Sequence, residues 1–421
     1  MAGVEMSTNE RIPMRARKQP CYFSAGTALR LFLLFESVLL SATSAYAQTN
    51  TIPDSLALPA FSALILDMSE PEGEFHTDNL TSNESAYLHP LPILLNLELS
   101  GGVYVGVGPE QNFAYIGALR PEMAFIVDIR RQNMLQHLLY KALFALSDTR
   151  ADFLSKLLSK PLYEDLPFFS RMFRSAPSWV AAEREPSIEE LIDYFDSVDP
   201  VESLYSDNLA QIRSLIGTYG IDASDDMMAI EHVYNEFYRR QLDIQYDLRG
   251  RDGKQLRQFP DLRDLLSAAT IQGETAGFLA SELSYRYVKD MQRRNLIVPV
   301  VGDFSGDRAL RAIAEFVKMH EATISVFYTS NVEYYLIAWG YTGFSRFIDN
   351  VDRFPTEKNS VFVRSFENDS NPVMLSHPDR IGDHLFTTLV QPISSLLEDG
   401  SWRELRGNDL YRHIVTVGNL D

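Results

Sequence analysis

The stretch GGVYVGVGPEQNFAYIGALRPEMAFIVDIRR, residues 101–131, decides the fold. Its first apolar run, residues 103–107, predicts a strand that breaks into a tight turn at two glycines, and a short helix is expected after the turn. A second apolar run, residues 123–127, predicts a strand that ends on Asp128. Twenty positions separate Gly108, the second glycine, from Asp128. That spacing is close to the roughly 20 residues between a nucleotide-binding glycine turn and the carboxylate that accepts ribose hydroxyls.

Four later apolar runs predict further strands, and polar residues directly follow two of them. The first of these two ends at Asp303, and the second ends at Ser330 and Asn331. Strands that alternate with helices indicate an α/β fold with a mostly parallel sheet and helices on both faces. Ligands bind such sheets at the carboxyl ends of the strands, so these polar residues predict the rim of a pocket. The four runs lie at residues 296–301, 323–328, 360–364 and 410–417.

A large helical insertion is predicted between the second and third strands, over residues 150–275. Ser187 and Glu190 have the spacing of a capping box and predict the start of a helix. A second helix is expected around residues 227–242, where apolar residues recur on one face.

The first 47 residues have the pattern of a secretory signal peptide. Basic residues precede an apolar run at residues 31–40, and small residues at Ala45 and Ala47 form a cleavage pattern. The run is too short to span a bilayer, which takes about 20 residues. We therefore expect an exported protein, periplasmic or extracellular, or a cytoplasmic one if the signal is not used. Cys21, the one cysteine of the chain, lies in this segment, so the mature chain would have no thiol.

The net charge and the histidine spacing of the chain limit which ligands and partners it is expected to bind. A formal net charge of −19 disfavours binding to nucleic acid or to an anionic membrane, because both reward clustered Lys and Arg. The eight histidines are scattered without a paired spacing, so no metal site is predicted. We expect a small-molecule ligand and no stable membrane span once the signal is removed. A dehydrogenase that uses a dinucleotide stays open, although Pro109 and Gln111 hinder the close approach of a pyrophosphate to the turn.

The order of these elements resembles the Rossmann-like fold of the S-adenosylmethionine-dependent methyltransferases. VYVGVGPEQN (residues 103–112) resembles their first motif, and AFIVDIR (124–130) resembles their second strand. VVGDF (300–304) resembles the end of the third strand, and SVFYTSNVEYYL (325–336) resembles the fourth strand with its helix. The whole chain also resembles a large uncharacterised bacterial family, which implies no activity.

The methyltransferase resemblance implies a role for each matching residue. The glycine turn would approach the amino-acid part of S-adenosylmethionine, Asp128 would hold the ribose hydroxyls, and Asp303 would lie beside the adenine. Glu333 or Tyr328 would orient or deprotonate the methyl acceptor. The implied cofactor-binding residues are Gly106, Gly108, Glu110, Asn112, Asp128, Asp303, Ser330 and Asn331, and the candidate catalytic residues are Glu333 and Tyr328.

Two functions follow as hypotheses. The first is binding of S-adenosylmethionine and transfer of its methyl group to an unknown acceptor. The second is an exported, non-catalytic binding or interaction module that keeps the fold without the cofactor, because S-adenosylmethionine is a cytosolic metabolite. The predicted organisation is a signal peptide at 1–47, a linker segment at 48–90, the first half of a Rossmann-like domain at 91–149, the helical insertion at 150–275 and the second half of the domain at 276–421.

Overall fold

The computed structural model describes residues 51–400, apart from 76, 98, 100, 167–170, 172–174, 221–222, 250–254, 256, 339–340, 370 and 372. The predicted signal peptide, Cys21 and the predicted strand at residues 410–417 lie outside the described residues. Within the described part of the chain, no helix is both long and apolar enough to cross a membrane.

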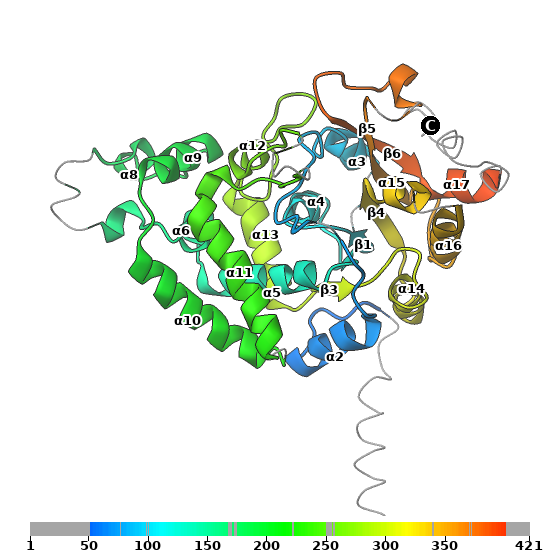
Figure 1. Ribbon diagram of the computed structural model, residues 1–421, viewed down its shortest axis with the longest axis horizontal. Coiled ribbons are helices and arrows are strands. Elements are labelled where there is room, and N and C mark those ends of the chain that lie inside the picture. Colours follow the sequence, from blue (N-terminus) through cyan, green and yellow to red (C-terminus); the bar gives the residue numbers. More distant parts are fainter. Residues whose placement is uncertain are drawn as a thin grey trace, which may run out of the picture. The chain divides into compact units, whose positions relative to one another are not determined.

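A six-stranded sheet organises the described residues, with the strand order β3-β2-β1-β4-β5-β6 (Figure 1). The first five strands are parallel to their neighbours, and β6 runs antiparallel to β5. The α/β fold with a mostly parallel sheet is therefore confirmed. The strands are β1 (Val103–Gly106), β2 (Met123–Asp128), β3 (Ile297–Val301), β4 (Ile324–Ser330), β5 (Val361–Glu367) and β6 (Phe386–Pro392).

The central strands are buried on both faces. Val105 of β1 pairs with Phe125 of β2 on one side and with Phe327 of β4 on the other, and all three side chains are buried. A strand covered on both faces needs apolar residues at every position, which is why these segments are nearly continuous apolar runs. The chain leaves β1 toward β2 and later returns to the other side of β1 as β4, so the direction of the strand order reverses between β1 and β4.

Helices cover both faces of the sheet (Figure 1). On one face, α5 contacts β2 and β3, and α13 contacts both α4 and α5. On the other face, α14 contacts β2, α2 and α16, and α2 contacts β3. The crossovers from β1 to β2 and from β2 to β3 run in one direction along the sheet, and the crossover from β3 to β4 runs back in the other. Right-handed connections therefore place their helices on opposite faces. These helices are α2 (Leu58–Met68), α4 (Gln111–Leu119), α5 (Arg131–Leu146), α13 (Glu282–Arg293), α14 (Ala309–Met319) and α16 (Tyr341–Val351).

Most of the described residues between α5 and α13 are helical. The capping box is confirmed: the Ser187 hydroxyl accepts from the Glu190 amide at 3.2 Å, and the Glu190 carboxylate accepts from the Ser187 amide at 2.8 Å. Helices α10 and α11 of this region contact α5. The helices here are α6 (Arg150–Leu158), α8 (Ser178–Ala181), α9 (Ile188–Ser197), α10 (Glu202–Thr218), α11 (Ser224–Arg240) and α12 (Leu262–Leu266). Elsewhere lie α3 (Leu91–Asn96), α15 (Val332–Ala338) and α17 (Ile393–Asp399), with short 3-10 turns at Tyr163–Asp165, Gln241–Asp243 and Met374–Ser376.

The segment before β1 packs onto the sheet. Phe61 and Ile65 of α2 are buried, and the chain then passes the carboxyl ends of β3 and β2. The Glu70 amide donates to the Val301 carbonyl, and the Gly73 amide donates to the Ile129 carbonyl, both at 3.0 Å. Residues 70–75 and 77–85 are called the crossing segment below.

Candidate functional site

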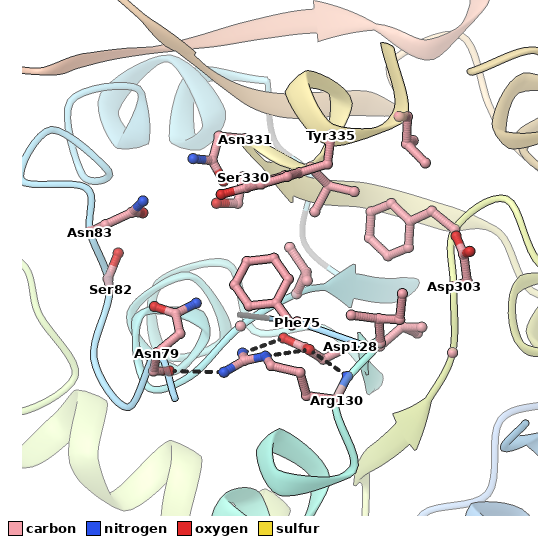
Figure 2. Close-up of a pocket in the computed structure, with 18 of the residues that line it drawn as sticks. Phe75, Asn79, Ser82, Asn83, Asp128, Arg130, Asp303, Ser330, Asn331 and Tyr335 are labelled. Atoms are coloured by element: carbon pink, nitrogen blue, oxygen red, sulfur yellow. Dashed lines mark hydrogen bonds and ion pairs between the residues drawn. The ribbon is translucent and has the colours of Figure 1, made fainter. Parts of the chain in front are cut away.

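A cleft opens at the carboxyl ends of the four strands β1 to β4, and the crossing segment forms one of its walls (Figure 2). The cleft holds about 700 Å³ of empty space when its open mouth is included. The residues that line it are Phe75, Asn79, Ser82, Asn83, Val107, Gly108, Gln111, Val127, Asp128, Ile129, Arg130, Gly302, Asp303, Phe304, Ser330, Asn331, Val332, Tyr335 and Leu336. Five of the eight predicted cofactor-binding residues are therefore brought together here: Gly108, Asp128, Asp303, Ser330 and Asn331.

The turn after β1 requires glycine at its second position. Gly108 has a φ of +81°, in the left-handed region, and a Cβ there would lie 2.7 Å from Nε2 of Gln111. A side chain at this position would strain the backbone and occupy the space beside the cleft.

Asn112 and Gly106 stabilise the turn itself and do not contribute to the cleft surface. The Asn112 amide donates to the carbonyls of Val107 at 2.9 Å, Gly108 at 3.1 Å and Pro109 at 2.8 Å. Its oxygen accepts from the Tyr104 hydroxyl at 2.9 Å. A Cβ on Gly106 would lie 2.0 Å from that oxygen, so Gly106 makes room for Asn112. Neither residue lines the cleft, and their predicted contact with a cofactor stays a prediction.

Asp128 ends β2 and is bound by Arg130. The Arg130 guanidinium donates to both carboxylate oxygens, at 3.0 Å from Nε and 2.8 Å from Nη2, and its backbone amide adds a third bond at 2.9 Å. Nη1 of Arg130 donates to the carbonyls of Asp78 and Asn79 in the crossing segment. Figure 2 shows this pair on the floor of the cleft, opposite Ser330 and Asn331. Asp128 thus helps to fix the crossing segment through Arg130.

Asp303 follows β3, and among the described residues the hydrogen bonds to its carboxylate go to one oxygen. Oδ1 accepts from the Ser305 amide at 2.7 Å and the Ser305 hydroxyl at 2.9 Å. The Asp303 amide donates to the Glu70 carboxylate at 2.6 Å. Burial raises the pKa of the Glu70 carboxyl, and the nearby negative charges of Asp303 and Asp307 raise it further. The end of β3 is therefore an electronegative part of the cleft wall.

Ser330 ends β4 in a strained conformation that a buried carboxyl holds in place. Its φ is +51°, which is uncommon for a residue other than glycine. Its hydroxyl donates to Glu84, which is fully buried and also accepts from the Tyr328 hydroxyl at 2.9 Å and the Ser365 hydroxyl at 2.6 Å. Burial raises the pKa of Glu84, against the lowering effect of the hydroxyl donors. Glu84 thus joins the crossing segment to β4 and β5.

Glu110 and His137 lie behind the glycine turn and do not line the cleft. Glu110 accepts weak bonds from the Ser82 amide at 3.4 Å and the Tyr140 hydroxyl at 3.5 Å, and burial raises its pKa to about 7. His137 contacts the Gly108 carbonyl through Nε2 at 2.9 Å, and burial lowers its pKa to about 4. His137 is therefore neutral at pH 7 and donates from Nε2 to that carbonyl.

Neither candidate catalytic residue lines the cleft. Glu333 forms a buried ion pair with Arg364, with both carboxylate oxygens accepting at 2.6 Å. Tyr328 is fully buried, and its hydroxyl is bonded to Glu84. Both side chains hold β4 and α15 to neighbouring elements, so their predicted roles in proton transfer have no geometric support in this arrangement.

Several residues of the cleft were not predicted from the sequence. The crossing segment contributes Phe75, Asn79, Ser82 and Asn83, although its composition indicates only a linker. Arg130 could have been suspected, because it stands two positions after the predicted strand end at Asp128. Within the described residues there is no group of three or more His, Cys, Asp or Glu side chains placed to hold a metal ion.

Comparison with known proteins defines the class to which the chain belongs. Its residues 80–178 and 201–408 match a family described as a domain of unknown function, DUF7790. The chain belongs to this family. It is also similar to catalase B of Emericella nidulans, with 28% identity over 192 residues, which cover 43% of this chain and 25% of that protein. The chain thus spans about a quarter of the length of this curated relative.

Proposed function

We propose that the protein is a binding module whose cleft takes an adenosine-containing small molecule, with S-adenosylmethionine as the first candidate. The observation that carries the proposal is the place of the cleft. It lies outside the carboxyl ends of β1 to β4, where the strand order reverses, which is where open α/β sheets bind ligands. The strand order also agrees with the Rossmann-like interpretation, which is part of the proposal.

The groups in the cleft suit a nucleoside. Gly108 lets a ligand approach the turn, and Asp128 and Asp303 stand at the ends of two adjacent strands. A carboxylate has about four acceptor positions, and Asp128 uses three of them for Arg130. One position therefore remains for a ribose hydroxyl. Phe75, Phe304 and Tyr335 supply aromatic surface against which a base could pack.

The cleft suits phosphate-rich ligands poorly. Arg130 is the one cationic side chain among the described residues that line the cleft, and its guanidinium is bound by Asp128 and two backbone carbonyls. A pyrophosphate in the cleft would be repelled by the carboxylates of Asp128 and Asp303, and the one cation among the described lining residues, Arg130, is already bonded to Asp128. This charge balance favours a nucleoside over a dinucleotide.

Methyl transfer is the alternative to a binding role without catalysis, and export is a separate proposal. If the protein is exported, the adenosine-containing ligand would be one other than the cytosolic S-adenosylmethionine. Methyl transfer would use a group that orients or deprotonates the acceptor. The side chains of Glu333 and Tyr328, the candidates for that role, are both engaged away from the cleft, which favours a binding role without catalysis. Export rests on the pattern in residues 1–47, and sequencing the N-terminus of the mature protein from fractionated cells tests it. A chain outside the cytoplasm that begins at Gln48 would support export, and an uncleaved cytoplasmic chain would contradict it.

Calorimetric titration tests the binding proposal. We expect S-adenosylmethionine or adenosine to bind at one site, and N331W, which fills the cleft, to weaken binding at least about ten-fold. The matched control is N359W, an exposed asparagine at the opposite end of the strands, which should bind as the unmodified protein does. No binding at millimolar ligand would contradict the proposal, as would equal effects of the two variants.

A further inference from the structure

The ionisable groups of the cleft have unequal hydrogen-bonding capacity. The guanidinium of Arg130 donates to the Asp128 carboxylate and to the carbonyls of Asp78 and Asn79. Little of its hydrogen-bonding capacity therefore remains for a ligand. Asp303, in contrast, uses only Oδ1 within the described structure, for the amide and hydroxyl of Ser305. With about four acceptor positions on a carboxylate, two remain on Asp303.

Unpartnered acceptors lie in the same cleft. Gln111 is 4% exposed and lines the cleft, and its Oε1 accepts no hydrogen bond from the described residues, while its Nε2 donates weakly to the Val107 carbonyl at 3.4 Å. Oδ1 of Asn79, in the crossing segment, is buried and likewise has no donor among the described residues. A buried acceptor without a donor is costly, so these two oxygens indicate that a bound group brings N–H or O–H donors to them.

The net charge and the aromatic surface of the cleft also favour a positively charged ligand. The charged residues described as lining the cleft are Asp128, Arg130 and Asp303, so one negative charge is in excess. Glu70, bonded to the Asp303 amide, adds a second carboxylate beside this wall. Phe75, whose ring centroid lies 5.5 Å from the Arg130 guanidinium carbon, already packs against a cation.

From these observations we propose that the cleft selects ligands that carry a positive charge, such as a sulfonium or a protonated amine, together with N–H or O–H donors. This inference rests on the proposed function and specifies the class of ligand. The cleft therefore prefers S-adenosylmethionine to its neutral thioether product, S-adenosylhomocysteine, at the position of the sulfur. This preference comes from the uncompensated carboxylate of Asp303, whereas the acceptors of Gln111 and Asn79 bind N–H or O–H donors, which both ligands carry.

The test compares ligands that differ in one charge. Calorimetry at low and high salt measures the affinities of S-adenosylmethionine, of S-adenosylhomocysteine and of an analogue in which a protonated amine replaces the sulfonium. We expect both cations to bind at least about ten-fold more tightly than the thioether, with a ratio that shrinks in high salt. D303N should reduce the ratio to about three-fold or less. D307N, in the same loop but paired with Arg311 and Arg346, should keep it.

A second pair of probes separates failure of this inference from failure of the proposed function. Putrescine and 1,4-butanediol have the same length and differ in charge. Equal binding of the charged and neutral adenosine ligands would overturn the charge selectivity and leave the adenosine site standing. If no adenosine ligand binds but putrescine binds and butanediol does not, the proposed function fails and the selectivity stands. If none of the five probes binds, both are overturned.

Discussion

Glu333 is predicted to be a structural residue, and its replacement should destabilise the fold strongly. Its side chain is 3% exposed and that of Arg364 is 1% exposed, with their charged atoms 2.6 Å apart. Replacing Glu333 by leucine leaves the Arg364 cation buried without its carboxylate. Breaking a buried pair from one side costs about 3–5 kcal/mol of unfolding free energy.

Urea unfolding followed by circular dichroism measures this cost. With a denaturant dependence of about 3 kcal/mol per molar urea, a loss of about 4 kcal/mol moves the midpoint by roughly 1 M. The matched control is E231L, which breaks the exposed pair between Arg213 and Glu231, with 51% and 29% of the two side chains exposed. An exposed pair of this kind contributes about 0.2–1 kcal/mol.

A double variant makes the reasoning falsifiable. In E333L combined with R364L no buried charge is left unpaired, so the double variant should be more stable than E333L alone. The reasoning would be refuted if E333L cost no more than E231L. It would also be refuted if the free energy of unfolding that the double variant loses equalled the sum of the losses in E333L and in R364L. The two charges would then act independently.

Three further predictions concern residues near the site or in the insertion. The pKa of Glu110 is raised from 4.5 to about 7 in the folded state. Between these two pH values the folded protein keeps a proton that the unfolded chain loses, so the free energy of unfolding falls as the pH rises from about 4.5 to 7. E110Q should therefore gain on the order of 3 kcal/mol relative to the unmodified protein between pH 5 and pH 8, and a difference that does not change with pH would contradict this. S187A should cost about 1 kcal/mol by removing the cap of α9, whereas S214A, at an exposed position within α10, should cost less than about 0.5 kcal/mol in the same urea assay. N112L should cost about 2–4 kcal/mol of unfolding free energy, because three carbonyls and the Tyr104 hydroxyl each lose a hydrogen bond, and a loss of ligand affinity without a loss of stability would contradict its structural role.

The sheet could be predicted largely from the sequence because its central strands are buried on both faces. Such strands are continuous apolar runs, and five of the observed strands start within one residue of the predicted runs. The antiparallel β6 was missed, because Thr387, Thr388 and Gln391 make it look like a polar segment. These side chains are buried and bonded to Asn368, Ser365 and Arg364, which only the folded structure brings within reach.

The cleft could be predicted only where it depends on strand ends. Parallel topology places Gly108, Asp128, Asp303, Ser330 and Asn331 at one edge of the sheet, and in the structure these five residues line one cleft. The wall made by the crossing segment depends on long-range contacts, above all those of the buried Glu84, which local patterns do not encode. Glu333 in α15 and Tyr328 in β4 show the converse limit, since a side chain at or near a strand end can pack inward instead of facing the cleft.

The most direct test of the central claim is a crystal structure of the protein grown with S-adenosylmethionine. We predict electron density for the ligand between the glycine turn at Gly108 and the crossing segment, with its ribose beside Asp128 and with N–H or O–H donors of the ligand at Gln111 and Asn79. Density for the ligand elsewhere on the protein, with the cleft holding only water, would contradict the claim that this cleft is the ligand-binding site.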